Sequence, residues 1–212
     1  MVKFLIIRHG FSLSNKDGTF TGQLDIGLSK VGKLQAKAVS NYLLENYKID
    51  AVYSSDLSRA VDTVKGVADA LGIPVITDAR LREYYCGKWE GLTVAQVEEL
   101  YLDDLNKWRT DNGGDVGPTD GETRDQIRDR SVAALKEIAQ KNQGKTVVVA
   151  THGGTIKAMQ EVWKDPLNLL NESWATNAST SVVEFDGTDF VVSLNGYDEY
   201  LGRDKTEMPK GI

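Results

Sequence analysis

Four short runs of apolar, mostly β-branched residues constrain the fold of this chain more than any other feature. They occupy residues 2–7, 49–53, 74–77 and 146–150, and runs of this length are typical of strands buried on both faces of a sheet. Helical patterns separate the first three runs, and this order predicts a parallel sheet with right-handed crossovers. We therefore expect an α/β three-layer sandwich, with a mostly parallel sheet flanked by helices.

The two segments that separate these strands show helical spacing of apolar residues. In the first helix, predicted over 29–45 with Ser29 as its N-cap, the expected buried face consists of Val31, Leu34, Ala38 and Tyr42. In the second, which follows Ser55, it consists of Val61, Val64, Ala68 and Leu71. Gly72, followed by Pro74, is expected to end the second helix.

Two more helices are predicted by capping-box spacing, at Thr93 with Gln96 and at Thr123 with Gln126. The stretch 110–121 between them is rich in Gly and Asp, which favours a mobile loop. We expect the whole excursion 92–121 to be a helical lid inserted into a single domain over 1–195.

The C-terminal part of the chain is expected to contribute a hairpin and a tail. Residues 182–185 and 190–194 read as strands on either side of Asp186-Gly187, which predicts a hairpin at the edge of the sheet. The segment 196–212 is polar and is expected to form a loose tail.

Composition and charge limit the kinds of partner and the cellular compartment that we expect for this protein. The formal net charge is −6, from 25 Lys and Arg against 31 Asp and Glu, and no basic run is present that could follow a nucleic-acid backbone. The apolar run 2–7 is too short for a signal peptide or a membrane span. Cys86 is the only cysteine, so an internal disulfide is impossible. We expect a cytoplasmic protein without nucleic-acid or membrane partners.

Polar residues follow three of the predicted strands, at the sheet edge where ligands bind in open parallel sheets. These residues are Arg8-His9-Gly10 after the first strand, Ser54-Ser55 and then Arg59 after the second, and Thr151-His152-Gly153 after the fourth. His9 and His152 are the only histidines in the chain, and a glycine follows each of them directly. That pairing favours a shared functional site over two separate structural roles.

Arg8 and Arg59 add the chemistry of anion recognition to the two histidines. A guanidinium group offers forked N–H donors that match a phosphate, and Arg59 lies where a helix N-terminus also favours anions. Two imidazoles and two guanidinium groups together make a pocket for a dianion. A zinc site is the rival interpretation, but it would need carboxylate ligands, and the arginines would repel the cation. We therefore expect neither a metal ion nor another cofactor.

These residues resemble the histidine phosphatase superfamily, which includes cofactor-dependent phosphoglycerate mutases and many small phosphatases. The similarity runs from residue 2 to about 194. It is carried by Arg8-His9-Gly10 with Asn15 and Thr21-Gly22, the run 24–38, the run 54–60, Leu81-Arg82-Glu83 with 87–91, and Thr151-His152-Gly153. The resemblance implies a phosphoglycerate mutase-like fold and a metal-independent phosphatase acting on small-molecule phosphate monoesters.

The resemblance also implies a role for each matched residue. His9 would be the nucleophile that forms a phosphohistidine, and Glu83 the general acid and base. The group that binds substrate and phosphate would comprise Arg8, Asn15, Thr21, Gly22, Arg59 and His152. His9 can attack only as the neutral ring, with one nitrogen donating to a fixed acceptor. We expect that acceptor to be a backbone carbonyl near Gly10.

Two other functions stay open at this point, together with the question of specificity. A cofactor-dependent phosphoglycerate mutase would return the phosphoryl group to a bound sugar acid, but the mutases compared have a longer insertion and a longer tail. A non-catalytic phosphate-binding regulatory module would be expected to lack His9 or Glu83, and both are present. Phe11 stands where the family usually has Glu or Gln, which predicts a more apolar entrance. The sequence identifies neither the physiological substrate nor the oligomeric state.

Overall fold

The computed structural model describes residues 1–111, 114–170 and 175–206 of the chain. Its centre is a seven-stranded sheet of order β3-β2-β4-β1-β6-β7-β5. The strands are β1 Val2–Arg8, β2 Ala51–Ser54, β3 Val75–Thr77, β4 Thr146–Thr151, β5 Trp163–Lys164, β6 Thr180–Phe185 and β7 Phe190–Tyr197. The helices are α1 Leu13–Asp17, α2 Lys30–Asn46, α3 Ser58–Leu71, α4 Val94–Thr110, α5 Arg124–Lys141 and α6 Gly153–Gln160.

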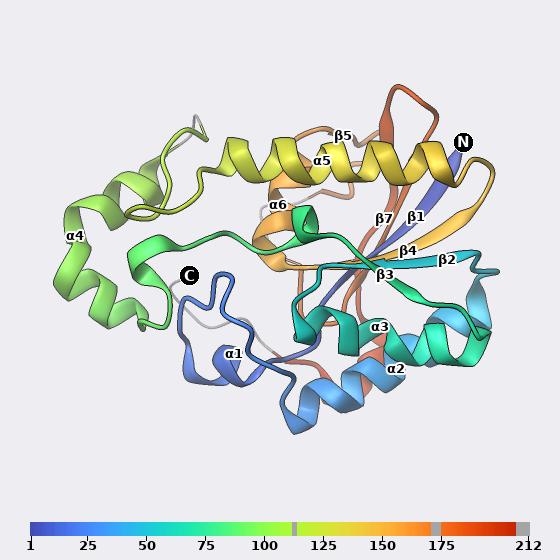
Figure 1. Ribbon diagram of the computed structural model, residues 1–212, viewed down its shortest axis with the longest axis horizontal. Helices are drawn as coiled ribbons and strands as arrows, with labels where there is room; N and C mark the ends of the chain where they lie inside the picture. Colours follow the sequence, from blue (N-terminus) through green and yellow to red (C-terminus); the bar gives the residue numbers. More distant parts are fainter. Residues whose placement is uncertain (112–113, 171–174, 207–212) are drawn as a thin grey trace.

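Helices cover both faces of this sheet, so the predicted three-layer architecture is confirmed. Figure 1 shows α5 and α6 on one face and α2 and α3 on the other. Strands β1, β4, β2 and β3 are parallel to one another, as the strand-helix order predicts. None of the helices in the described part of the chain has the length and apolarity needed to cross a bilayer.

The hairpin is formed as predicted, but its place in the sheet differs. β6 pairs antiparallel with β1 and with β7, so the hairpin continues the sheet instead of ending it. The edge is the two-residue strand β5, which pairs with β7. A strand of two residues carries no alternation of apolar and polar residues, so the sequence pattern does not predict it.

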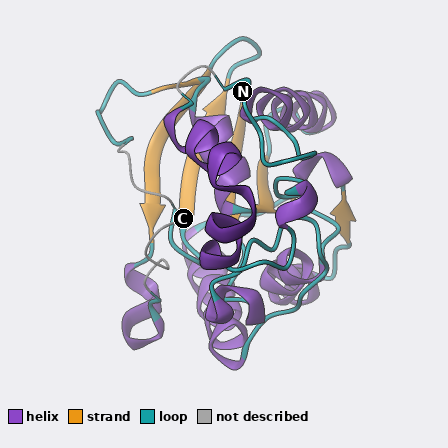
Figure 2. Cartoon of the chain, turned by 90° about the vertical axis from the view of Figure 1, so that its left-hand side faces the viewer, coloured by secondary structure: helices purple, strands orange, loops and turns teal. Residues whose placement is uncertain are grey.

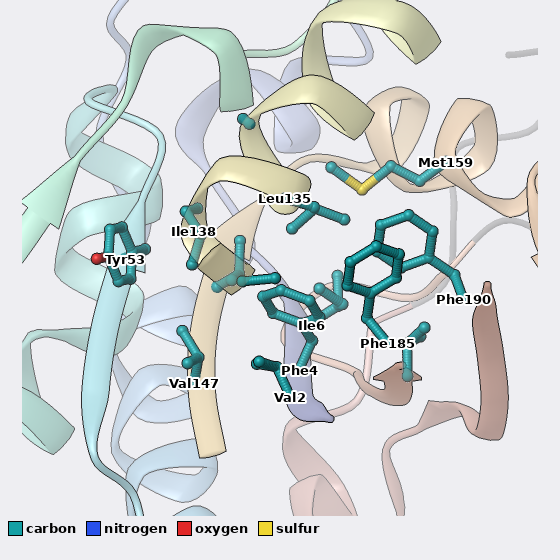
Figure 3. Packing of buried hydrophobic residues seen from close by; sticks show 14 of the residues in the cluster. Val2, Phe4, Ile6, Tyr53, Leu135, Ile138, Val147, Met159, Phe185 and Phe190 are labelled. Carbon is teal, nitrogen blue, oxygen red and sulfur yellow. The ribbon is translucent and has the colours of Figure 1, made fainter. Parts of the chain in front are cut away.

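Strand β1 is apolar along its length because its two faces serve two different cores. Phe4 and Ile6 pack toward α5 and α6, in the cluster drawn in Figure 3 with Leu135. Leu5 and Ile7 face the opposite way, toward α2 and α3. Each of these side chains is fully buried, and such burial stabilises the fold by about 1.5–3 kcal/mol per side chain. The strand that carries the first site motif is therefore anchored from both sides.

The buried face predicted for α2 is wrong. Val31 and Leu34 are 37% and 52% exposed, and the buried stripe consists instead of Gly32, Gln35, Ala36, Val39, Ser40 and Leu43. The first turns of α2 pack against the loop after β1, where space is short. A Cβ atom on Gly32 would lie 2.2 Å from the carbonyl oxygen of Phe11, so only glycine fits there.

A third apolar cluster lies under α4, beyond the sheet end reached by β1 and β4. It contains Phe20, Trp89, Val97, Leu105 and Ile127. Both predicted capping boxes are present at the start of α4 and α5. In Figure 2, which looks from this side, α4 stands in front of the sheet. The segment expected to form a lid thus contains a helix, α4, that packs on this third apolar cluster.

The described part of the C-terminal tail is not loose, contrary to the expectation. Residues Glu199–Asp204 form a 3₁₀ helix that packs on α2. The ring of Tyr200 stacks on Tyr42 at a centroid distance of 4.4 Å, and Gln35 Nε2 donates to the Asp204 carbonyl at 2.8 Å. Residues 207–212 lie outside the described part.

Candidate active site

The predicted site residues gather at the carboxyl ends of three adjacent strands. β2, β4 and β1 are neighbours in the sheet, so the segments that follow them meet. A cavity of about 100 Å³ is lined by seven of the eight candidates, namely Arg8, His9, Asn15, Thr21, Gly22, Arg59 and Glu83. His152, the eighth, lies beside His9 with a distance of 5.0 Å between ring centroids.

His9 is held as a neutral ring with one nitrogen committed to the backbone. Its Nδ1 lies 2.8 Å from the carbonyl oxygen of Gly10. A carbonyl can only accept, so Nδ1 carries the proton and the lone pair of the neutral ring is on Nε2. This confirms the predicted acceptor. Burial, and then the charges of Arg59 and Arg8, hold the pKa of His9 well below its ordinary value of 6.5.

Contacts from distant parts of the chain fix the loop that carries His9. Thr63 on α3 accepts a hydrogen bond from the Gly10 amide at 2.9 Å. Asn177 Nδ2 donates to the His9 carbonyl at 3.1 Å and to Asn15 Oδ1 at the same distance. Sequence reasoning missed Thr63 and Asn177, because neither lies at a strand end with a recognisable motif.

His152 is fully buried and pairs on one side only. Its Nε2 lies 2.9 Å from Ser55 Oγ, and that oxygen already accepts from the Leu57 amide at 3.3 Å. The Ser55 hydroxyl can donate to Nε2, and in that tautomer the His152 proton is on Nδ1. This nitrogen has no hydrogen-bond partner within the described residues. Burial, followed by the charge of Arg59, lowers the pKa of His152 well below its ordinary value.

Arg8 and Arg59 are buried cations, 4% and 1% exposed. Arg59 donates to the carbonyl oxygens of Leu24 at 2.7 Å and Gly22 at 2.9 Å, and Arg8 donates to that of Ala175 at 2.5 Å. Burial lowers the pKa of Arg8 to about 10, against the opposing effect of Glu83, and it also lowers the pKa of Arg59. Arg8 remains charged at neutral pH.

Glu83 is the one acidic side chain among the described residues that line the cavity. Its carboxylate accepts from the amides of Gly154 and Thr155 at the N-terminus of α6, both at 3.1 Å, where the helix favours negative charge. The cavity lining therefore carries two cationic groups and one anionic group. The whole chain is negative, but this cleft has the positive excess that an anionic ligand requires.

Arg130 on α5 fixes the backbone around Glu83, and sequence reasoning missed it entirely. It donates to the carbonyl oxygens of Arg80 at 2.7 Å, Arg82 at 2.8 Å and Glu83 at 2.9 Å. Its Nε and Nη2 also pair with the carboxylate of Glu122 at 2.8 and 2.9 Å. The three bonds to carbonyl oxygens fix the segment before and at Glu83. A single arginine in a helix, 47 residues away, gives no local signal of this role.

The cavity has an apolar part, but Phe11 is not among its described lining residues. This part is lined by Phe20, Tyr84, Trp108 and Pro118. The Phe11 backbone instead pairs with Gln35 and Ser29 on the α2 side. The described residues bring together no group of three or more His, Cys, Asp or Glu side chains arranged for a metal ion.

Comparisons with known proteins agree with this geometry. The family model for the histidine phosphatase superfamily (branch 1) matches residues 4–197. The chain is 33% identical to phosphoglycerate mutase-like protein 4 of Arabidopsis thaliana, over 94% of this chain and 86% of that protein. It is also 33% identical to a metal-independent phosphoserine phosphatase of the same plant, over 91% and 80% of the two chains.

A solved structure is similar over nearly the whole chain. A mycobacterial glucosyl-3-phosphoglycerate phosphatase in complex with VO3 superposes with a TM-score of 0.80 at 28% identity, covering 92% of this chain and 99% of that one.

The two neutral imidazoles predict a specific dependence of stability on pH. Below pH 6.5, the ordinary pKa of histidine, the unfolded chain takes up protons that folded His9 and His152 resist. The free energy of unfolding then falls as pH falls, by about 1.4 kcal/mol per pH unit and histidine. Urea unfolding of wild type and His9→Ala between about pH 7.5 and 5.5 measures this slope. We expect the variant to lose less stability on acidification; parallel curves would contradict the buried neutral ring.

Proposed function

The chain belongs to the histidine phosphatase superfamily, and we propose that within it His9 carries the phosphoryl group of a phosphate monoester to water. The relatives and structural neighbours of this chain include phosphatases. The chain is a phosphoric monoester hydrolase. One observation supports the proposed role most strongly. The hydrogen bond from His9 Nδ1 to the Gly10 carbonyl, 2.8 Å long, places the lone pair on Nε2 in a cavity lined by two guanidinium groups.

In the first step, His9 Nε2 attacks phosphorus and the bond from phosphorus to the ester oxygen breaks. Protonated Glu83 gives its proton to the departing oxygen, so an alcohol leaves and a phosphohistidine remains. Phosphoryl transfer depends mainly on positioning and on stabilising charge at the equatorial oxygens. Arg8 and Arg59 provide that stabilisation.

Two neutral donors, from His152 and Asn15, bind the phosphate together with Arg8 and Arg59. We call these four residues the phosphate cradle. The buried Nδ1 of His152, which no described residue pairs, donates to one phosphate oxygen, because a buried donor without a partner costs about 1–3 kcal/mol. Asn15 contributes its NH₂ group, since its Oδ1 already accepts from Ser12 and Asn177. The carbonyls of Gly22 and Leu24 keep Arg59 in place, while Thr21 lines the cavity beside them.

In the second step, water attacks the phosphohistidine and the bond from His9 Nε2 to phosphorus breaks. Glu83, now ionised, takes a proton from this water, so inorganic phosphate leaves and both residues return to their starting states. The amides of Gly154 and Thr155 hold the carboxylate in position for this step.

The proposal extends to the surroundings of the site. Residues 1–195 would act as one domain, and the segment 92–121 would close over the bound ester as a lid. Trp108 and Pro118, both from that segment, line the cavity, which supports this role. We place the reaction in the cytoplasm, on a small phosphorylated metabolite and without nucleic-acid or membrane partners.

The direct test of this function is phosphate release in the presence of excess chelator. Wild type is expected to hydrolyse several members of a panel of phosphate monoesters, and His9→Ala to lose on the order of a thousandfold or more in kcat. Equal rates for the two proteins would overturn the proposal, as would a strict need for added metal. Phosphoryl transfer to phosphoglycerate that requires a bisphosphoglycerate, without release to water, would identify a mutase instead.

A second prediction concerns Arg130, which we infer positions Glu83 for proton transfer. Arg130→Gln is expected to lower kcat/KM for an alkyl phosphate about 10- to 100-fold relative to p-nitrophenyl phosphate, whose leaving group needs no proton. Arg128→Gln, on the same helix but paired at the surface with Asp125 and Glu161, is the matched control and should leave the ratio unchanged. An equal loss for both esters with Arg130→Gln would indicate a structural role only.

A further inference from the structure

The cavity has an apolar wall that the phosphoryl-transfer steps do not use. This wall consists of Phe20, Tyr84, Trp108 and Pro118, and Thr19 and Cys86 also line the cavity. These side chains come from separate parts of the chain, namely the loop after α1, the Glu83 segment, the end of α4 and the loop that follows it. They converge on the same cavity as His9.

This wall is built as a packed aromatic cluster. The rings of Phe20, Trp89 and Trp108 meet edge to face, with centroid distances of 5.3 Å for Phe20 and Trp89, 6.2 Å for Phe20 and Trp108, and 5.8 Å for the two tryptophans. Trp89 is fully buried behind it, with its Nε1 donating to Thr119 at 3.1 Å. Such edge-to-face contacts stabilise each pair by about 0.5–1.5 kcal/mol beyond area burial.

The backbone of Phe20 is fixed as well. Its amide donates to the Leu92 carbonyl and its carbonyl accepts from the Gly91 amide, both at 2.8 Å. Backbone hydrogen bonds, as well as contacts with the neighbouring rings, therefore fix the position of the Phe20 ring. A preformed aromatic surface beside the phosphate cradle favours an apolar ring, because binding requires little reordering of the protein.

The proposed reaction already uses each of the ionisable groups Arg8, Arg59 and Glu83 that line the cavity. Arg8 and Arg59 are needed by the phosphate dianion, and Glu83 is the proton donor. No other Lys, Arg, Asp or Glu is among the described lining residues. A carboxylate on the alcohol part of a substrate would therefore share the two guanidinium groups with the phosphate, because no further cation is among the described lining residues. An uncharged ring needs no cationic partner.

We propose that the alcohol part of the preferred substrate is uncharged and carries a single aromatic ring, which packs against Phe20, Tyr84 and Trp108. This inference rests on the proposed function, since it assumes that the cradle binds the ester phosphate. The cavity volume of about 100 Å³ is well below the 300–1,000 Å³ of pockets for drug-sized ligands. One ring on a short linker fits that size better than a nucleoside.

The test compares esters whose leaving groups are similar in reactivity. 2-Phenylethyl phosphate, ethyl phosphate, phosphoserine and 3-phosphoglycerate are all esters of primary alcohols, so differences in kcat/KM report mainly on contacts with the protein. We expect 2-phenylethyl phosphate to exceed each of the other three on the order of tenfold or more. A higher kcat/KM for phosphoserine or 3-phosphoglycerate would overturn the inference.

Variants connect this preference to the wall. Trp108→Ala is expected to lower the ratio of kcat/KM for 2-phenylethyl phosphate to that for ethyl phosphate at least about fivefold. Tyr85→Ala is the control, because Tyr85 is 44% exposed and is not a described lining residue. An unchanged ratio with Trp108→Ala would overturn the inference. Trp108→Leu, which retains bulk but not the ring, repeats the comparison if the alanine variant does not fold.

Failure of this inference can be distinguished from failure of the proposed function. If wild type hydrolyses these esters in a His9-dependent manner but prefers a charged alcohol part, only the aromatic preference is wrong. If none of the esters is hydrolysed, or if His9→Ala hydrolyses them at the wild-type rate, the phosphatase assignment of the site fails and the inference fails with it.

Discussion

The burial of two arginines and two histidines in one small space is the constraint on which the rest of this structure depends. Removing Arg8 and Arg59 from water is unfavourable unless their donors are paired, and backbone carbonyls of Ala175, Gly22 and Leu24 take part of that role. The same burial, with the arginine charges, keeps His9 and His152 neutral. A phosphate dianion suits this environment, because it supplies the negative charge and the acceptors that the site needs.

Packing and hydrogen bonds to the backbone hold the segments of the site in place. β1 is held between two apolar cores, and the loop after it packs on α2 at Gly32 so closely that a side chain would not fit. Arg59 ties the cradle to the backbone at Gly22 and Leu24. Arg130 fixes the Glu83 segment through three carbonyls. The proposed nucleophile, phosphate-binding residues and proton donor thus come from different segments but meet in one geometry, as the proposed phosphoryl transfer requires.

Much of the fold and most of the site could be predicted from the sequence, and several of the failures share a physical cause. Buried strands, capping boxes and residues at strand ends leave local signals, so the sheet and the His9 and His152 segments were predictable. Packing against a neighbouring backbone leaves none: the buried face of α2 is rich in Gly, Gln and Ser, not in large apolar residues. Asn177, Thr63 and Arg130 act through hydrogen bonds to backbone groups that are distant in the sequence, which no spacing rule could reveal. Phe11 was expected at the entrance because it directly follows the Arg8-His9-Gly10 motif. The cavity is lined instead by Phe20 and Trp108.

The central claim is that the phosphoryl group passes through a covalent bond to His9. It is tested most directly by mixing the protein with a phosphate monoester that carries radiolabelled phosphorus, quenching in alkali within one turnover, and locating the label by peptide mass spectrometry. If His9 carries the phosphoryl group, we expect an acid-labile, alkali-stable label on this residue. The label should form and decay fast enough to support steady-state turnover. Hydrolysis at the full rate without any labelled protein, or with the label on another residue, would contradict it.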